Sequence, residues 1–251
     1  MSEDAVLLYA TTDDGVATLT LNRPTARNAL NTALCEALLG AARRAATEGA
    51  RLVVIRAAGP VFSAGADLKE RKGMSDDAVR ARRVKAFAAY DAIERLAMPV
   101  IAVVEGPAVG SGVEIAAVAD FILATPAASF RTPEALWGTV GATQRLARIV
   151  GKRLAKDMMF TGRVLSAEEA RDAGFVARVI APEALEKTLA EITAVITKAP
   201  ASSVALAKRC IDEGLERDPR GALATELMAI EESLAAAEWR RTMAGFATGE
   251  G

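Results

Sequence analysis

Short apolar runs alternate with helix-like segments along the first two-thirds of the chain. The strand-like runs lie at residues 15–21, 52–56, 100–104 and 121–124. The first alternates apolar and polar residues, as a half-buried strand does, and the others are mainly apolar runs typical of buried strands. Between them, residues 31–46 have the pattern of an amphipathic helix, and residues 76–96 that of a long helix with charged residues near its start. This alternation of strand and helix predicts an α/β core.

Beyond about residue 143, few segments have a strand-like pattern. We expect one short strand at residues 176–180, and helices at residues 143–150, 153–161, 166–173, 182–197, 202–216 and 219–243. Gly151, Gly162 and Gly174 separate the first of these helices, and Ser166 with Glu169 has the spacing of a capping box. No repeat or flexible linker interrupts the chain. Residues 1–190 are therefore expected to form the core, and residues 191–251 a helical extension of it rather than an independent domain.

Composition limits the cellular location and the partners that we expect for the chain. Of its 251 residues, 51% are hydrophobic, which is enough to bury a sizeable core. No stretch reaches about 18 uninterrupted apolar residues, and the acidic N-terminus lacks the features of a signal peptide. We therefore expect a cytoplasmic protein that does not span a membrane. The net charge of -1 argues against a nucleic-acid partner, which would favour a basic excess.

The chain contains no histidine. This absence excludes Ser-His-Asp and Cys-His nucleophile pairs, histidine-ligated zinc and histidine acid–base chemistry. The two cysteines, Cys35 and Cys210, are far apart and lack metal-ligand spacing, so we interpret them as reduced packing thiols. If the protein is an enzyme that transfers protons, carboxylates are the expected carriers.

Three motifs carry the candidate chemistry. They are PVFSAGADLKE at residues 60–70, VVEGPAVGSGVEIA at residues 103–116 and FRTPEALWG at residues 130–138. The first two motifs each follow a buried strand and precede a helix-like segment. Their side chains are small, so their backbone N–H groups can approach a bound molecule closely. Taken singly, the first motif also fits an ordinary loop, and the second a glycine-rich turn. Glu114 or Glu134 alone likewise fits a carboxylate that stabilises the start of a helix.

In combination, these motifs resemble the active site of the crotonase superfamily, the enoyl-CoA hydratase and isomerase family. The LTLNRP stretch at residues 19–24 and the pair Gly245 and Phe246 extend the resemblance over nearly the whole chain. It implies an α/β protein with the spiral ββα crotonase fold and C-terminal helices that mediate trimerisation. We therefore expect a homotrimer, or a hexamer made from two trimers, that acts on an acyl-CoA.

The resemblance also implies which groups perform the reaction. Glu114 and Glu134 would hold one water, with one carboxylate acting as base on it and the other supplying a proton to the α carbon. The amides of Ala66 and Ser111 would form the oxyanion hole, where losing one donor typically costs about 3 kcal/mol. Glycine is commoner than serine at the second donor position, so the Ser111 side chain needs room. Coenzyme A is part of the substrate, and no separate cofactor or metal is expected.

The coenzyme A contacts are expected along the first motif. Ala64 would lie beside the adenine, and Asp67, Leu68 and Lys69 follow it as the predicted coenzyme A-binding residues, although Asp67 also fits a structural role. Lys69 either meets the phosphates or belongs to a solvated charged face. Further on, Trp137 either lines the acyl pocket or fills the core.

Two departures from the family pattern bear on the function. The segment between Glu134 and Gln144 is about three residues shorter than usual and lacks a proline, and Gly141 is the candidate to take over its role. The tail after Phe246 lacks the basic residues that often follow there. Hydration of a 2-enoyl-CoA to a 3-hydroxyacyl-CoA is the leading hypothesis. The alternatives are double-bond isomerisation, a specialised acyl-CoA dehydration, and acyl-CoA binding without effective catalysis.

Overall fold

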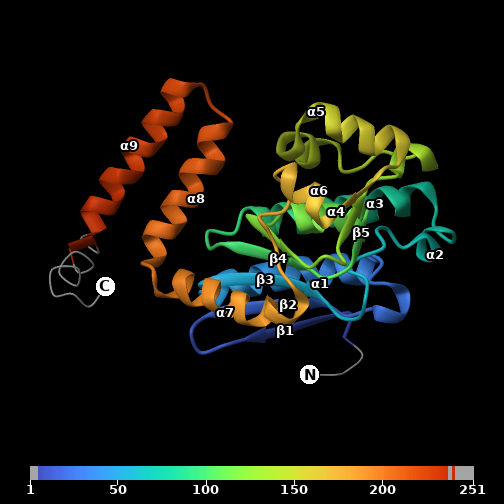
Figure 1. Cartoon of the computed structure of the whole chain (residues 1–251), viewed down its shortest axis with the longest axis horizontal. Coiled ribbons are helices and arrows are strands. Elements are labelled where there is room, and N and C mark those ends of the chain that lie inside the picture. The colour runs from blue at the N-terminus through green and yellow to red at the C-terminus, as the bar shows by residue number, and fades with distance from the viewer. Residues whose placement is uncertain (1–4, 237–238, 241–251) are drawn as a thin grey trace.

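Two β-sheets form the framework of the protein (Figure 1). A computed structural model describes residues 5–236 and 239–240. The larger sheet has the strand order β1-β2-β3-β4-β6-β9. Its strands are β1 (Leu7–Thr11), β2 (Val16–Leu21), β3 (Leu52–Ala57), β4 (Val100–Val104), β6 (Phe121–Ala124) and β9 (Arg178–Val179). Within the larger sheet, β1 and β2 pair antiparallel, and all the other neighbouring strands pair parallel, as the strand–helix alternation favours.

The chain passes from the larger sheet to the smaller one between β4 and β5 (Pro107–Val109). The order of the smaller sheet is β5, β7 (Ser129–Arg131) and β8 (Val164–Ser166). β4 of the larger sheet ends at Val104 and β5 of the smaller begins at Pro107, so the chain changes sheet almost at once. Helix α4 (Ser111–Ala117) starts directly after β5. The start of α4 is therefore fixed by its attachment to both sheets.

The core lies on both faces of the larger sheet. Alternate residues along β3 point to opposite sides: Val53 and Ile55 join the main core, and Leu52 and Val54 the second one. The main core is closed by α1 (Thr32–Thr47), α3 (Asp76–Glu94) and α4, and the second by α7 (Pro182–Lys198). The other helices of the body are η1 (Pro24–Ala26), α2 (Leu68–Arg71), η2 (Glu134–Trp137), α5 (Thr143–Thr161) and α6 (Ala167–Asp172).

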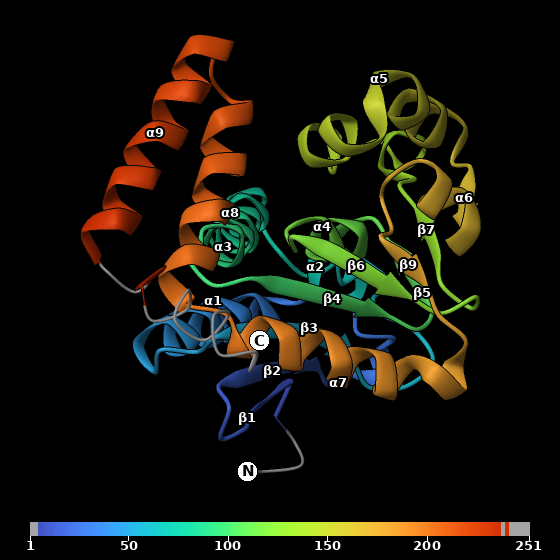
Figure 2. The same ribbon diagram turned by 60° about the vertical axis from the view of Figure 1, so that its left-hand side comes forward.

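Helices α8 (Ala201–Leu215) and α9 (Pro219–Ala236) form a pair that stands away from the sheets (Figure 2). Lys208 of α8 connects this pair to the body by an ion pair with Asp120, at 3.0 Å. The expected boundary at residue 190 falls inside α7, whose apolar face packs on the sheet up to Ile196. Among the described residues, no single helix has the length and apolarity of a membrane span. The consecutive helices α7 and α8, bent by 102°, reach those limits together by length and composition alone.

Most of the expected elements are present. The expected helices at 143–150 and 153–161 occur as α5, in which Gly151 has φ +78° and interrupts the helical backbone. The Ser166 capping box is confirmed, with the Glu169 amide 3.2 Å from Oγ. The strand expected at 176–180 is only two residues long, and the last residues of the helix expected at 219–243 lie outside the described part.

Candidate active site

Two backbone turns, at residues 63–67 and 109–112, lie against each other. The amide of Val109 donates to the carbonyl of Ser63 at 2.9 Å. Gly65 has φ +87°, and a Cβ there would stand 2.7 Å from the Val109 oxygen and 3.5 Å from the Ser111 nitrogen. A Cβ on Gly112 would stand 2.5 Å from the Ser63 oxygen. Glycine is therefore required at both contacts, because a side chain would push the turns apart.

The amides of Ala66 and Ser111 lie on these two turns. Leu30 pairs with Ala66 in a parallel bridge that uses the Gly65 carbonyl and the Asp67 amide, at 2.7 and 3.0 Å. That pattern leaves the Ala66 amide outside the bridge. Ser111 is the first residue of α4, where an amide has no partner within the helix. Within the described residues neither amide donates a hydrogen bond. The two N–H groups are thus available to an oxygen on a bound molecule.

Glu114 lies one helical turn after Ser111 and is only 6% exposed. Its Oε2 accepts a hydrogen bond from Arg145 of α5 at 3.0 Å. The same guanidinium donates to Glu94 of α3 at 2.6 Å. One arginine therefore ties α3, α4 and α5 together and gives the buried carboxylate a charged partner, as burial of a charge requires.

Glu134 approaches the start of α4 from another element. It begins η2, and its carboxylate lies against two glycines: a Cβ on Gly110 would be 2.6 Å from Oε1, and a Cβ on Gly141 would be 3.3 Å from Cγ. Its Oε2 is buried and has no hydrogen-bond partner among the described residues. Burial raises the pKa of Glu134, the charge of Glu114 raises it further, and Arg83 opposes this rise. The two carboxylates are thus close enough to influence each other.

Comparison with known proteins agrees with this geometry. A family model described as enoyl-CoA hydratase/isomerase matches residues 11–249. The chain belongs to the enoyl-CoA hydratase/isomerase family. It is 36% identical to a probable mitochondrial enoyl-CoA hydratase 2 of Arabidopsis thaliana, over 94% of this chain and 80% of that protein. It is 35% identical to a putative enoyl-CoA hydratase/isomerase of Bacillus subtilis, over 96% of this chain and 94% of that protein.

Solved structures of this family confirm the crotonase fold predicted from the sequence. An enoyl-CoA hydratase from Bacillus anthracis superimposes with a TM-score of 0.94 at 32% identity, covering 98% of this chain and 97% of that one. An enoyl-CoA hydratase from Mycobacterium smegmatis gives 0.93 at 34% identity, with the same coverage. The mixed α/β body and the C-terminal helices are therefore those of an enoyl-CoA hydratase/isomerase fold.

The segment predicted to hold coenzyme A has a mixed character. Ala64 is half-buried, and its amide donates to the Arg27 carbonyl at 2.9 Å. Asp67 caps α2 by accepting from the Lys69 amide at 3.1 Å, and it forms an ion pair with Arg23 at 3.0 Å. Burial raises the pKa of Asp67, but its hydrogen bonds outweigh this effect and the pKa is lowered overall.

Asp67 thus has the partners of a structural residue. Leu68, which is 59% exposed, and Lys69 are the members of this segment that face solvent.

The shortened segment after Glu134 is held by a residue that sequence reasoning missed. Arg83 of α3 donates to the Val140 carbonyl at 2.7 Å and to the Thr139 hydroxyl at 3.0 Å. Gly141 follows directly and packs against Glu134. Arg83 carried no motif signal of its own, since its role comes from tertiary contacts.

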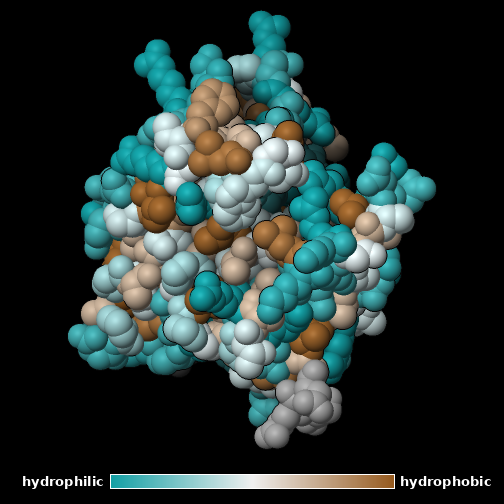
Figure 3. All heavy atoms as spheres, turned by 90° about the vertical axis from the view of Figure 1, so that its right-hand side faces the viewer, coloured by the Kyte–Doolittle hydropathy of each residue, from teal (hydrophilic) through white to brown (hydrophobic). Residues whose placement is uncertain are grey.

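Apolar side chains are exposed close to Glu134 along the chain and on the facing helix. In Figure 3, which looks onto the side bearing α2, α3 and α5, hydrophobic groups lie among hydrophilic ones. Trp137 is 57% exposed, so it does not fill the core. Leu136 and Val140, with Val84 and Phe87 of α3, are also exposed. These side chains offer apolar surface in the region expected to meet an acyl group.

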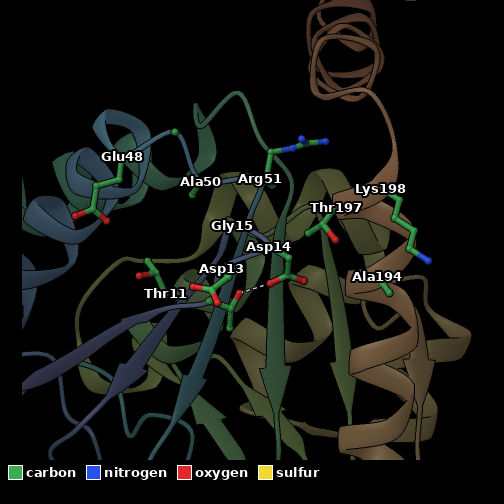
Figure 4. Close-up of a pocket in the computed structure, with 12 residues that line it drawn as sticks. Thr11, Asp13, Asp14, Gly15, Glu48, Ala50, Arg51, Ala194, Thr197 and Lys198 are labelled. Atoms are coloured by element: carbon green, nitrogen blue, oxygen red, sulfur yellow. Dashed lines mark hydrogen bonds between the residues drawn. The ribbon is translucent and has the colours of Figure 1, made fainter. Parts of the chain in front are cut away.

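A separate surface hollow of about 820 Å³ shares no residue with the two turns (Figure 4). Residues 11–15 and 48–51 line it together with three residues of α7. Its charges are mixed, with Asp13 and Asp14 on one segment and Arg51 and Lys198 on others. No cluster of three or more potential metal ligands occurs in the described part of the chain.

Proposed function

We propose that this protein hydrates a 2-enoyl-CoA thioester to a 3-hydroxyacyl-CoA. The observation that carries the proposal is the convergence of two carboxylates, Glu114 and Glu134, beside two amides without partners among the described residues. Addition of water to the conjugated double bond places negative charge on the thioester oxygen. Amides of Ala66 and Ser111 would stabilise that charge, and fixed donors of this kind are among the largest contributions to catalysis.

The two glutamates have environments that suit opposite roles. Glu114 is paired with Arg145 as a carboxylate, which suits a base that takes a proton from the attacking water. Glu134 has a raised pKa because of burial and the neighbouring charge, which suits a proton donor to the α carbon. A carboxyl group whose environment raises its pKa is commonly the acid of a two-carboxylate site. The protons belong to a coupled pair, so a pH profile reports the pair rather than each residue.

A crotonase reaction that needs one carboxylate, such as double-bond isomerisation, is the second candidate. The feature in its favour is the segment between Glu134 and Gln144, which the family resemblance implies to be shorter than usual and which packs beside the second glutamate. Specialised dehydration and acyl-CoA binding without turnover would rest on the same departure. Against binding alone, both carboxylates are retained and Gly141 still packs against Glu134.

We also propose that the protein assembles as a homotrimer or as a hexamer of two trimers. The α8–α9 pair exposes large apolar side chains, including Leu215 at 82% and Met228 at 72%. Exposed apolar side chains of this size favour burial between subunits of a closed symmetric assembly. Sedimentation equilibrium would test this proposal, and a monomer alone at micromolar concentration would contradict it.

A panel of enoyl-CoA thioesters of different chain length tests the proposed reaction. Loss of the conjugated enoyl absorbance with formation of the 3-hydroxyacyl-CoA is the expected result for at least one thioester. A 3-enoyl-CoA included in the panel reports isomerase activity by gain of the same absorbance. Isomerisation without hydration would favour the second candidate, and binding with no turnover of any thioester would contradict both reactions.

A further inference from the structure

Tyr90 presents a buried hydroxyl that the proposed reaction does not use. The residue lies on the inner face of α3 and is 2% exposed. Its hydroxyl has no hydrogen-bond partner among the described residues. Buried polar groups in folded proteins nearly always find a partner, so an unpaired phenol of this kind needs an explanation.

The surroundings of Tyr90 belong to the candidate active site. The guanidinium of Arg145 lies 5.8 Å from the centre of the Tyr90 ring, and the same group donates to Glu114. Ser111 is one turn before Glu114 on α4, so the two side chains share a helix face. The Ser111 hydroxyl lies beside the Tyr90 hydroxyl, but the pair does not reach hydrogen-bond geometry. Burial raises the pKa of Tyr90, so the phenol stays protonated and can donate.

Ser111 creates a need for such a donor. A glycine at this position would present only its amide, whereas serine adds a hydroxyl next to the same N–H. Ser111 is half-buried, and its hydroxyl lies beside that of Tyr90. A serine hydroxyl near the start of a helix readily turns toward neighbouring backbone groups. Some rotamers of Ser111 would therefore crowd the oxygen that its amide is proposed to bind.

We propose that Tyr90 is a positioning residue for Ser111. When an acyl-CoA is bound, the Tyr90 hydroxyl donates to Ser111 Oγ and holds that side chain away from the thioester. The Ser111 amide then faces the thioester oxygen without obstruction. Tyr90 itself touches no reacting atom, and its effect passes entirely through Ser111. This inference rests on the proposed function, because it assigns a task to one of the proposed oxyanion donors.

A double-mutant cycle tests the proposal. Tyr90→Phe in the natural background should lower kcat for the best enoyl-CoA about three- to tenfold, the scale of one neutral hydrogen bond, with little change in KM. The same substitution in a Ser111→Gly background should change kcat by less than about twofold, because no hydroxyl remains to be held. Equal losses in the two backgrounds, or no loss in either, would overturn the proposal.

Stability and a spectroscopic signal separate positioning from a structural role. Tyr90→Phe removes an unpaired hydroxyl and keeps the ring, so its melting temperature should be unchanged or higher. A clear fall would overturn the proposal in favour of a structural hydrogen bond. Acetoacetyl-CoA gives a readout without turnover. Its enolate absorbs light, and donors that hold the thioester oxygen increase the fraction of the bound molecule that is enolate. Tyr90→Phe should lower that absorbance only where Ser111 is present.

The same measurements distinguish failure of this inference from failure of the proposed function. Natural protein that hydrates an enoyl-CoA but shows no coupling between Tyr90 and Ser111 would overturn the positioning role alone. Natural protein that neither turns over any enoyl-CoA nor forms the acetoacetyl-CoA enolate would overturn the proposed function and this inference together.

Discussion

Gly110 lies so close to Glu134 that a Cβ on Gly110 would stand 2.6 Å from Oε1 of the carboxylate. Gly110 also has φ +53°, a conformation that strains most other residues. Gly110→Ala should therefore displace Glu134 and lower kcat by about a hundredfold, since a misplacement of about 1 Å at a reacting group has effects of that size. Steady-state hydration of crotonyl-CoA measures the loss.

Two other glycines provide matched controls for this substitution. A Cβ on Gly141 would stand 3.3 Å from Cγ of Glu134, so Gly141→Ala should cause a smaller loss of kcat. Gly138 has φ +69° but no atom within 4 Å of the added Cβ, so Gly138→Ala reports backbone strain alone. If Gly138→Ala lowered kcat as much as Gly110→Ala, contact with Glu134 would not be the cause.

Arg145 is predicted to be required for stability because it is the charged partner of Glu114. Arg145→Met should lower the free energy of unfolding by about 3 kcal/mol, the lower end of the range for breaking a buried ion pair, since Arg145 is partly exposed. For a chain of this size, the melting temperature should fall by about 2–4 °C for each kcal/mol. Differential scanning calorimetry provides the measurement.

Glu94→Gln is the control for that substitution, because it removes the more exposed partner of Arg145 and leaves Glu114 paired. It should have little effect. Adding Glu114→Gln to Arg145→Met should recover much of the lost stability, since the unpaired buried charge is gone. No recovery would mean that Arg145 stabilises the fold through packing rather than through Glu114.

The raised pKa of Glu134 predicts a pH-dependent change in stability. Because this pKa is higher in the folded than in the unfolded state, the ionised carboxylate weakens the folded state as pH rises through the folded value. The effect is absent below the ordinary glutamate pKa of about 4.3. Glu134→Gln should therefore raise the melting temperature at pH 7 to 8 and approach the natural protein near pH 4. If the melting temperatures of Glu134→Gln and the natural protein differed by the same amount at every pH in this range, an ionisation effect would be contradicted. Glu105→Gln changes an exposed glutamate and serves as the control.

The sequence predicted the long elements, and it singled out Glu114 and Glu134, which the fold brings to the start of the same helix. It did not predict β1, β5, β7 or β8, and β5, β7 and β8 are only three residues long, which is too short to show a periodicity. The site motifs were recognisable because they are local, with Ser111 and Glu114 one turn apart. Arg145, Arg83 and Tyr90 act across helices that are distant in sequence, so no local pattern reveals their contacts.

A complex with an acyl-CoA would test the oxyanion hole by geometry. We predict that the thioester oxygen lies about 2.7–3.1 Å from the nitrogens of both Ala66 and Ser111, the range for effective oxyanion donors. The Ser111 Oγ should then lie within hydrogen-bond distance of the Tyr90 hydroxyl. A thioester oxygen directed at side chains instead would exclude these amides as the donors.

The central claim, that two glutamates share one water, is tested most directly by crotonyl-CoA hydration with Glu134→Gln. The substitution keeps the shape of the side chain and removes its proton transfer, so kcat should fall by about two to four powers of ten, the usual scale of acid–base catalysis. Affinity for coenzyme A should change little, and Glu114→Gln should give a loss of similar size. Near-normal hydration by Glu134→Gln would contradict the paired-carboxylate mechanism.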